Sequence, residues 1–260
     1  MSTNFLQRIF KSVFGTKNEL TPPEKMKFVG NGDFVKIGNE FLEYFIDKAG
    51  LKPTDSVLDV GCGIGRMAVP LTRYLAEGVR YEGIDIVPKG IKWCNKKITP
   101  VYPNFKFQLA DIYNKLYNPK GKFKSSEYRF PYADNSFDFI FLTSVFTHML
   151  PADLENYLSE ISRVIKKDGR CLITYFLLNP ESLADIDKNI SQFTFQYNYN
   201  ADCRLQNDKI PEAAIGYQEE YISDLYKKYG MEIKTPVYYG SWSGRKDFLS
   251  FQDIVVATKL

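Results

Sequence analysis

Residues 57–65 decide the fold, and they read Val57-Leu58-Asp59-Val60-Gly61-Cys62-Gly63-Ile64-Gly65. The first four have an apolar bias and predict a buried parallel strand. The glycines that follow let the backbone turn sharply and approach a ligand, because no Cβ stands in the way. Residues 66–77 have apolar side chains at helical spacing, so the loop leads to a helix N-terminus with unpaired N–H groups. The stretch therefore predicts a nucleotide-binding loop.

The spacing of these glycines argues against a dinucleotide. The dinucleotide fingerprint is G-x-G-x-x-G, but here the third glycine comes one residue early and Arg66 stands in its place. We therefore expect a ligand other than NAD. Asp59, at the end of the strand, can orient the loop or meet a ligand ammonium group.

Two further strands end in carboxylates. Residues 81–86 predict the second strand and contain Asp85, placed so that its carboxylate accepts hydrogen bonds from both hydroxyls of a ribose. Residues 105–112 predict the third strand and contain Asp111. Three acids in register with the glycine loop make a chance arrangement improbable.

This pattern resembles class I S-adenosylmethionine-dependent methyltransferases, whose first motif is similar to Val57–Gly65. The resemblance is strong over residues 40–178 and looser from Thr21 to Asp253, and Ser144 to His148 is similar to the S-V-F-T-H stretch of uncharacterised bacterial members. It implies a Rossmann-like α/β fold with a seven-stranded, mostly parallel sheet whose last strand is antiparallel, flanked by helices. It also implies S-adenosyl-L-methionine as cofactor, S-adenosyl-L-homocysteine as product, and no metal.

The same resemblance implies roles for residues at the carboxyl edge of the sheet. Asp85 would hold the ribose and Asp111 the adenine amino group, with Ile86 and Ile112 flanking the base. The full set of expected cofactor-binding residues is Asp59, Gly61, Cys62, Gly63, Gly65, Asp85, Ile86, Ala110, Asp111, Ile112, Thr143 and Ser144.

Composition limits the class of protein. At 260 residues and 44% hydrophobic content the chain can bury a sizeable core. The net charge of +3 gives no broad basic field, which argues against DNA and RNA as partners. Cys62, Cys94, Cys171 and Cys203 show no C-x-x-C spacing, which indicates reduced thiols and a cytoplasmic location. No apolar run is long enough to span a bilayer, and the N-terminus lacks the apolar region of a signal peptide.

We expect an amphipathic helix within residues 1–20 and one methyltransferase domain over residues 21–260. The apolar half of residues 4–14 predicts docking on the domain or in a homodimer, and its basic half leaves peripheral membrane contact open. Two insertions, about 112–132 and 179–217, are expected to act as lids. The second lacks strong periodicity and is expected to form an excursion over the active-site edge, outside the core, where substrate specificity would reside.

The remaining elements follow from periodicity and end signals. We expect helices near residues 35–49, 89–97 and 218–229, and a buried strand at 137–142. A further helix opens at Pro151, carries Lys166 and Lys167 in its last turn, and ends at Gly169. Strands are expected at residues 170–178, 231–239 and 249–257.

His148, the only histidine, follows the fourth strand at the edge where open α/β sheets bind ligands. Methyl transfer from a sulfonium needs alignment and a deprotonated nucleophile, so a neutral imidazole here is a candidate general base. The alternative is that His148 only orients the loop by hydrogen bonding.

Several residues are candidates for binding the acceptor or for closing over it. Phe28, Asp33 and Phe34 lie in a turn-rich segment that is either a lid or a simple connector. The insertion at 112–132 is rich in lysine and tyrosine, which indicates either a solvated face or a site for an anionic group on the acceptor. Trp242 can wall a pocket and Arg245 can hold an anion, although both residues are as often structural. The acceptor candidates are Phe34, Tyr113, Phe146, Tyr175, Trp242 and Arg245.

The leading hypothesis is methylation of an oxygen atom on a small-molecule, sugar or lipid-like acceptor. Oxygen is favoured because His148 supplies a base and the N-P-P-Y or D-P-P-Y tetrad of amino-directed enzymes is absent after the fourth strand. The alternatives are an RNA or protein methyltransferase, supported by the lysine-rich insertion, and a cofactor-binding scaffold or sensor without catalysis. The sequence does not identify the acceptor.

Overall fold

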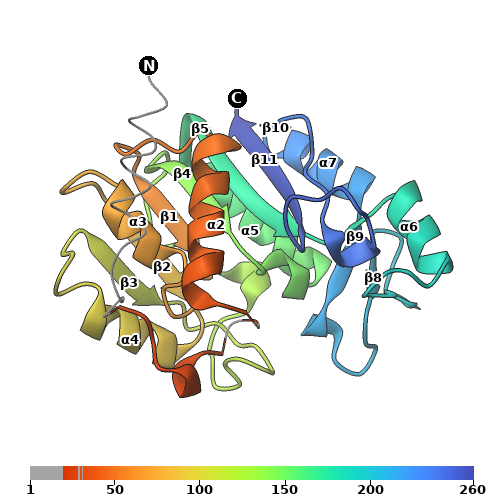
Figure 1. The fold of residues 1–260 in the computed structure, drawn as a ribbon, viewed down its shortest axis with the longest axis horizontal. Coiled ribbons are helices and arrows are strands. Elements are labelled where there is room, and N and C mark those ends of the chain that lie inside the picture. Colours follow the sequence, from red (N-terminus) through yellow and green to blue (C-terminus); the bar gives the residue numbers. More distant parts are fainter. Residues whose placement is uncertain (1–19, 29, 31) are drawn as a thin grey trace. The chain divides into compact units, whose positions relative to one another are not determined.

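A computed structural model of the protein describes residues 20–28, 30 and 32–260 (Figure 1). The predicted helix at 4–14 lies outside these residues, as do Val29 and Asn31 of the candidate lid. The chain forms two compact units, Met1–Ala110 and Asp111–Leu260. The boundary falls within residues 105–112, the range predicted for the third strand.

The described residues of the first unit include three parallel strands. They are β1 (Val57–Val60), β2 (Tyr81–Asp85) and β3 (Phe105–Leu109), with β2 in the middle. The helices of this unit are η1 (Glu24–Met26), α2 (Phe34–Asp47), α3 (Ala68–Tyr74) and α4 (Pro88–Lys97). Strand β1 is buried at every position, as its apolar sequence predicted. Helix α3 is shorter than the predicted helix at 66–77.

Helix α2 begins one residue before its predicted start because Asp33 caps it. The side chain of Asp33 accepts a hydrogen bond from the backbone N–H of Lys36 at 2.7 Å. Phe34, the first helical residue, is buried together with Leu42 and Phe45. These two lid candidates therefore serve in this structure as a helix cap and a core residue.

The second unit contains four strands of the main sheet. They are β4 (Phe137–Leu142), β5 (Ile165–Tyr175), β10 (Met231–Ile233) and β11 (Asp253–Lys259), and β11 lies between β5 and β10, antiparallel to both. With the strands of the first unit they make a seven-stranded, mostly parallel sheet, which confirms the predicted fold class. Helices α5 (Pro151–Val164) and α7 (Glu219–Lys228) belong to this unit.

The predicted end of α5 is wrong. The helix stops at Val164, and β5 begins at the next residue, where Ile165 is buried and pairs with Phe137. The register then shifts, because Phe139 pairs with Arg170 and residues 166–169 bulge out. Lys166, expected in the last helical turn, instead binds both carboxylate oxygens of Asp138 at 2.8 and 2.9 Å. Strand pairing and burial of Ile165 outweigh the helix propensity of the two lysines.

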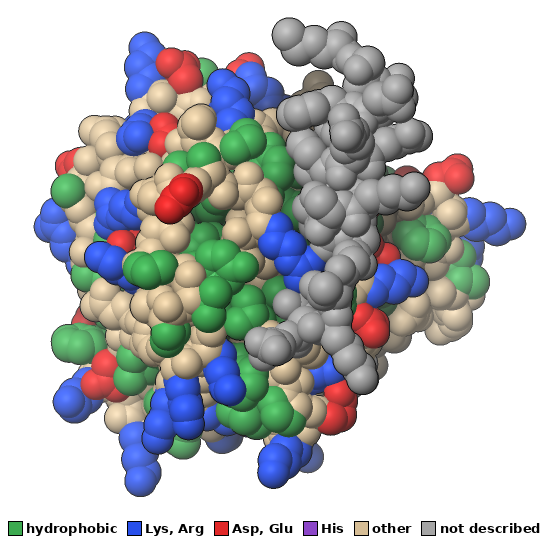
Figure 2. Space-filling view, turned by 60° about the vertical axis from the view of Figure 1, so that its left-hand side comes forward, with side chains coloured by type: hydrophobic (Ala, Val, Ile, Leu, Met, Phe, Trp, Pro, Cys, Tyr) green, Lys and Arg blue, Asp and Glu red, His purple; other side chains and the backbone are tan. Residues whose placement is uncertain are grey.

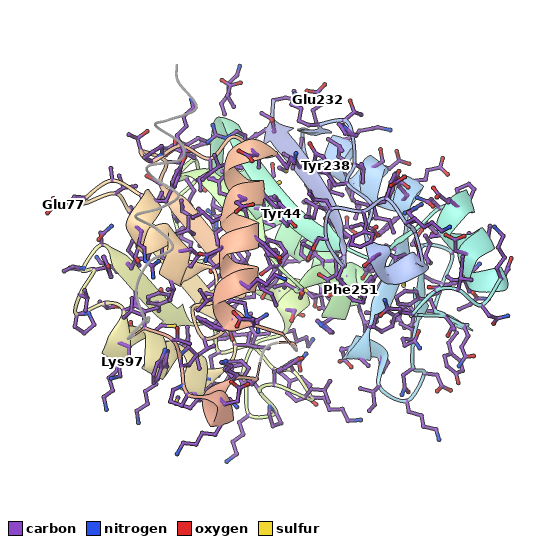
Figure 3. All side chains as sticks on the ribbon, viewed as in Figure 1. Tyr44, Glu77, Lys97, Glu232, Tyr238 and Phe251 are labelled. Carbon is purple, nitrogen blue, oxygen red and sulfur yellow. The ribbon has the colours of Figure 1, made fainter. Side chains whose placement is uncertain are left out.

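The last two strands are also shorter or shifted relative to their predicted ranges. Strand β10 ends at Ile233, and β11 begins at Asp253. Between them only an isolated bridge joins Tyr238 to Ile254, so residues 234–252 form a long connection. Figure 3 labels Tyr238 and Phe251, which lie at opposite ends of this connection.

The segment 179–217 contains regular elements that its weak periodicity did not predict. It contributes three strands to a second, four-stranded sheet, made of β6 (Leu177–Leu178), β9 (Ile215–Gln218), β8 (Cys203–Leu205) and β7 (Tyr197–Asn198) in that order. It also forms helix α6 (Pro180–Asp187) and the turn η4 (Pro211–Ala213). Strands this short leave no readable period in the sequence.

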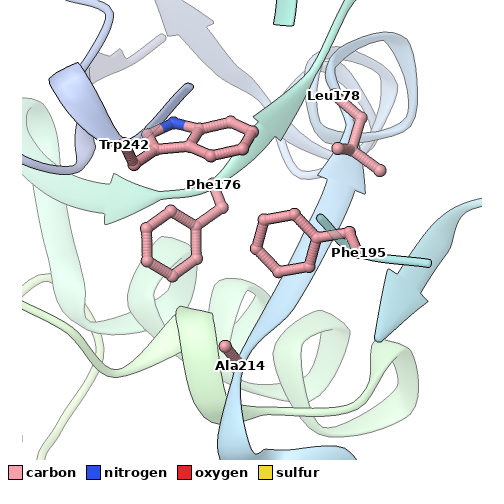
Figure 4. Close-up of a cluster of buried hydrophobic side chains, with 5 residues drawn as sticks. All are labelled: Phe176, Leu178, Phe195, Ala214 and Trp242. Atoms are coloured by element: carbon pink, nitrogen blue, oxygen red, sulfur yellow. The ribbon is translucent and has the colours of Figure 1, made fainter. Parts of the chain in front are cut away.

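The small sheet has its own hydrophobic cluster, drawn in Figure 4. The members are Phe176, Leu178, Phe195, Ala214 and Trp242. Trp242, in the turn η5 (Ser241–Ser243), packs edge to face on Phe176 and Phe195, with ring centroids 5.4 Å apart in each pair. The cluster explains why this segment is ordered despite its polar sequence.

The described surface carries charges of both signs with hydrophobic side chains exposed between them on the face that Figure 2 shows. All four cysteines are buried with free thiols. Among the described residues, no helix is long and apolar enough to cross a membrane.

Candidate functional site

The glycine loop after β1 has the backbone conformation that its sequence predicted. Gly61, Gly63 and Gly65 have φ angles of 86°, 56° and 84°, in the left-handed region that side chains disfavour. A Cβ on Gly65 would lie 2.8 Å from Cδ1 of Ile98. The loop is therefore a bare backbone concavity at the end of a strand, which suits the close approach of a ligand.

Asp85 fixes this loop to the end of β2. Its Oδ2 accepts the N–H of Gly63 and its Oδ1 accepts the N–H of Val87, both at 2.7 Å. Burial raises the pKa of Asp85 to about 6, although these backbone N–H groups lower it. Each carboxylate oxygen keeps a further lone pair, so the predicted contact with ribose hydroxyls is compatible with the observed bonds.

Asp59 has one oxygen without a partner. Its Oδ2 accepts a hydrogen bond from the Tyr81 hydroxyl at 2.6 Å, whereas its Oδ1 is buried with no hydrogen-bond partner among the residues the structure describes. Burial raises the pKa of Asp59 to about 8, and the nearby Asp85 adds to this rise. An orphaned buried acceptor beside a glycine cradle fits the cationic amino group of S-adenosylmethionine.

The segment before α2 approaches the same loop. Arg66 donates to the carbonyl of Gly30 at 3.2 Å, and the ring of Phe28 lies under Nζ of Lys89 at 4.5 Å. Phe28 also meets Gly90, where an added Cβ would lie 3.0 Å from its ring and only 2.2 Å from the carbonyl oxygen of Gly63. The lid candidate Phe28 is thus placed close to the glycine loop, whereas Phe34 is buried in the core.

The other cofactor candidates of the first unit lie at its strand ends. Cys62 is buried, and its N–H donates to the Ile84 carbonyl at 3.0 Å. Ile86 is half-buried and Ala110 is buried. The first unit therefore brings together six predicted residues through the loop and β2, which are Asp59, Gly61, Cys62, Gly63, Gly65 and Asp85.

In the second unit, Asp111 anchors the insertion that follows it. Its backbone carbonyl accepts the N–H groups of Lys122 and Phe123, and its carboxylate lies 3.5 Å from Nζ of Lys122. This exposed ion pair is weak, so the carboxylate can exchange partners. Ile112 is buried, and its predicted place beside the adenine stays a prediction.

Thr143 and Ser144 follow β4. Ser144 has a φ of 58°, its N–H donates to Oγ1 of Thr174 at 2.7 Å, and its hydroxyl donates to Gln252 at 2.9 Å. Non-glycine residues in this conformation are uncommon and cluster at functional sites. Thr143 is half-buried.

His148 lies at the end of the turn η3 (Phe146–His148) and is held by the turn η4. Its Nδ1 is 2.9 Å from the carbonyl oxygen of Glu212, which can only accept, so we assign the ring proton to Nδ1 and the lone pair to Nε2. Burial lowers the pKa of His148, although backbone carbonyls of Glu212 and Ala213 oppose the change. The ring of Tyr117 meets the imidazole edge to face at 6.3 Å. His148 is therefore a neutral, oriented imidazole.

The candidates for binding the acceptor differ in how far their side chains are exposed to solvent. Phe146, Tyr175 and Trp242 are fully buried. Tyr175 shares a hydrogen bond of 3.0 Å with the hydroxyl of Tyr226, and Nε1 of Trp242 donates to Asp253 at 2.8 Å. These contacts are structural. Tyr113 is the exposed member of the set.

Arg245 lines a cavity of about 600 Å³ together with residues 237–239 and 246–249 and Glu181. Its Nη2 binds Glu181 and Asn179, each at 3.0 Å, and its guanidinium stacks on the ring of Tyr239 at 4.2 Å. Its Nε and Nη1 are buried with no partner among the described residues. The predicted anion-holding role of Arg245 remains a prediction that these free donors support.

Sequence reasoning missed three residues that shape the site. Tyr81 was assigned only to a strand, yet it supplies the hydrogen bond to Asp59. Gly90 allows α4 to touch the glycine loop. Asp253 accepts from Leu177, Gly240 and Trp242. A glycine inside an amphipathic helix and an acid at the start of an apolar strand were the available signals.

A metal site was not predicted. Within the described ranges, no group of three or more His, Cys, Asp or Glu side chains is arranged to hold an ion.

Comparison with known proteins points to one family. Residues 58–173 match the family model of a methyltransferase domain. Phosphoethanolamine N-methyltransferase 1 of Arabidopsis thaliana is 28% identical over 155 residues, which are 59% of this chain and 27% of that protein. The sterol 24-C-methyltransferase of Schizosaccharomyces pombe is 30% identical over 126 residues, 48% of this chain and 29% of that protein. The chain thus spans between a quarter and a third of these relatives.

A solved structure shares the fold. The magnesium protoporphyrin IX methyltransferase of Synechocystis, determined with bound S-adenosylhomocysteine, superposes with a TM-score of 0.54 at 16% identity. The alignment covers 100% of this chain and 95% of that one. At this identity the similarity concerns the fold alone.

Proposed function

We propose that the protein is an S-adenosylmethionine-dependent methyltransferase that methylates an oxygen atom of a small-molecule or lipid-like acceptor, and the methyltransferase-domain model that matches residues 58–173 supports this proposal. The observation that carries this proposal is the combination of three left-handed glycines with two buried carboxyls, Asp59 and Asp85. A bare loop gives access to the cofactor, and the two acids offer acceptors for its ammonium and hydroxyl donors.

When bound, S-adenosylmethionine supplies an electrophilic methyl group on a sulfonium sulfur. The residues of this chain then have to bind the cofactor, orient the acceptor and deprotonate the acceptor hydroxyl. Gly61, Gly63 and Gly65 leave room for the amino-acid part, Asp59 offers Oδ1 to its amino group, and Asp85 offers lone pairs to the ribose. Alignment of the two reactants accounts for much of the rate in such a transfer.

His148 is proposed to accept the proton of the acceptor hydroxyl. Because its pKa is lowered by burial, the imidazole is neutral at neutral pH and Nε2 is free to take a proton. The Nδ1 bond to Glu212 fixes the ring orientation in the way that a positioned base requires.

The relatives support the class of acceptor more than the target atom. Their names specify phosphoethanolamine nitrogen and a sterol carbon, one small and polar, the other lipid-like. The preference for oxygen rests on His148 and on the absence of an N-P-P-Y or D-P-P-Y tetrad after β4.

Cofactor identity can be tested by ligand-dependent stability. We expect saturating S-adenosylhomocysteine to raise the melting temperature and NAD to leave it unchanged, because only a ligand of the folded state stabilises it. The reverse pattern would exclude the proposed cofactor.

The role of His148 can be tested once an acceptor is found by fractionating cell extracts for transfer of labelled methyl groups. We expect His148→Ala to reduce turnover by about 10² to 10⁴ with unchanged affinity for S-adenosylhomocysteine. The wild-type pH–rate profile should rise through an apparent pKa below the usual value for histidine, and this limb should vanish in the variant.

Glu212→Ala is the matched control, since it keeps the backbone carbonyl that binds Nδ1 and should retain turnover. If His148→Ala keeps wild-type turnover across the pH range, the histidine is structural. Tyr113, the exposed tyrosine of the candidate set, would then be the next residue to test.

A further inference from the structure

Residues 113–124, called here the 113–124 loop, expose four large apolar side chains. Tyr113, Leu116, Tyr117 and Phe123 are 51%, 49%, 40% and 54% exposed. Single exposed apolar residues are ordinary, but four within twelve residues suggest an interaction surface.

Hydrogen bonds hold this loop in one conformation. Oδ1 of Asn114 accepts the N–H groups of Leu116 and Tyr117, both at 3.0 Å, so the tip is a closed turn. The backbones of Asn114 and Asn118 bond each other in both directions, and the buried Asn118 side chain donates to the Ile112 carbonyl at 2.9 Å. The apolar side chains are therefore displayed by a built structure.

Basic side chains surround them. Lys115, Lys120, Lys122 and Lys124 are all exposed. From Asp111 to Arg129 the chain has five basic residues and two acidic ones, so this short segment carries a charge equal to the net +3 of the whole protein. The two acids make only exposed ion pairs, with Lys122 and Lys124, which offset little of the field.

The loop lies beside the candidate base. Tyr117 contacts His148 directly, and Nδ2 of Asn156 in α5 fastens the end of the insertion by donating to the Ser125 and Tyr128 carbonyls at 2.8 and 3.0 Å. Whatever binds the loop is therefore close to His148.

We propose that the 113–124 loop docks the protein on an anionic lipid surface and that the acceptor is an amphiphile taken from that surface. The inference about the acceptor rests on the proposed function. Aromatic rings and a leucine can enter the headgroup region while lysines meet anionic headgroups. Leu116 has no ring face to stack on a base, and the ring of Tyr117 is already engaged by His148, so the tip suits lipid better than single-stranded RNA.

Sedimentation of the full chain with vesicles tests the docking. We expect binding to vesicles of phosphatidylcholine with one third phosphatidylglycerol, and much weaker binding to pure phosphatidylcholine. The double variant Leu116→Glu/Phe123→Glu should weaken binding by about tenfold or more. Lys115→Gln/Lys120→Gln should weaken it by about fivefold for each lysine.

Val101→Glu and Lys167→Gln are the matched controls, since both residues are exposed outside the loop, and they should bind as the wild type does. Equal binding of the loop variants and the wild type, or equal binding to neutral and anionic vesicles, overturns the proposal. So does loop-dependent binding of an RNA oligonucleotide without vesicle binding.

Affinity for S-adenosylhomocysteine is measured on the same variants. Loss of vesicle binding with intact cofactor affinity is the result expected here. A protein that docks through the loop but binds no S-adenosylhomocysteine would contradict the proposed function and leave the docking surface standing.

Discussion

Burial of Asp59 links the protonation of one carboxyl to the stability of the protein. Its pKa is about 8 in the folded state against an ordinary value of 3.8, so between these values the folded state binds more protons than the unfolded state. The free energy of unfolding therefore falls as pH rises from about 4 to about 8. Asp59→Asn mimics the neutral form and keeps an acceptor for Tyr81.

We expect Asp59→Asn to match the wild type at about pH 4 and below, and to exceed it near pH 8 by a few kcal/mol in the free energy of unfolding, measured by urea titration. The variant should bind S-adenosylhomocysteine less tightly, because the amino group loses a charged partner. Parallel pH curves for the two proteins would mean that Asp59 does not titrate in this range.

Asp85 is expected to contribute to cofactor affinity, whereas an acid on the surface is not. Asp85→Ala removes the ribose acceptor and the anchor of Gly63, so we expect the dissociation constant of S-adenosylhomocysteine to rise about thirtyfold, equivalent to about 2 kcal/mol. Glu77, which Figure 3 labels at the periphery, is the control, and calorimetry should show no change for Glu77→Ala. Equal effects of both variants would remove Asp85 from the site.

At the scale of elements, α4 contacts the glycine loop through Gly90. This contact reverses the stabilisation that replacement of a helical glycine by alanine usually gives. Replacing glycine by alanine in a helix ordinarily stabilises it by up to about 1 kcal/mol. At Gly90 the new Cβ would lie 2.2 Å from the carbonyl oxygen of Gly63. We therefore expect Gly90→Ala to destabilise the fold by about 1–3 kcal/mol and to weaken cofactor binding.

Lys92→Ala, on the exposed side of the same helix, should leave both quantities nearly unchanged. Thermal melts with and without S-adenosylhomocysteine measure the two effects. A stabilised Gly90→Ala variant would show that α4 can move away from the loop.

At this scale the sequence predicted strands better than their connections. β1 and β4 have their predicted bounds because short, mostly apolar runs that are buried nearly throughout have few alternatives. The end of α5 was missed because the pairing of Ile165 with Phe137 is a tertiary contact that no local pattern reveals. The small sheet was missed because two- to four-residue strands have no measurable period.

In the candidate site, the positions that depend on backbone conformation, such as the glycines, could be predicted from the sequence. The surroundings of the side chains could not. Glycine spacing located the cradle, but the burial of Phe34, Tyr175 and Trp242 depends on partners distant in the sequence. Trp242 stands among glycines and serines, which give no local sign of burial, yet its Nε1 donates to Asp253 in the interior.

In the molecule as a whole, Asp253 joins the small sheet, the 234–252 connection and β11. Its carboxylate accepts from Leu177, Gly240 and Trp242 at 2.6, 2.6 and 2.8 Å. We expect Asp253→Ala to cost about 3–5 kcal/mol, since three buried donors lose their acceptor. In a Trp93→Phe background, the fluorescence of Trp242 should report unfolding at a lower urea concentration.

Asp247→Ala is the control, because this exposed acid lies in the same connection. It should leave the transition unchanged. A small sheet that melts separately from β11 in the wild type would contradict the coupling that these bonds imply.

The acid that secures the small sheet lies outside the segment that builds it. A chimaera that received residues 177–242 as a cassette would carry the donors of Leu177, Gly240 and Trp242 without their acceptor. Asp253, the first residue of β11, therefore has to be transferred together with residues 177–242. Recombination between related chains should succeed when the crossover lies beyond Asp253 and fail when it separates these two parts.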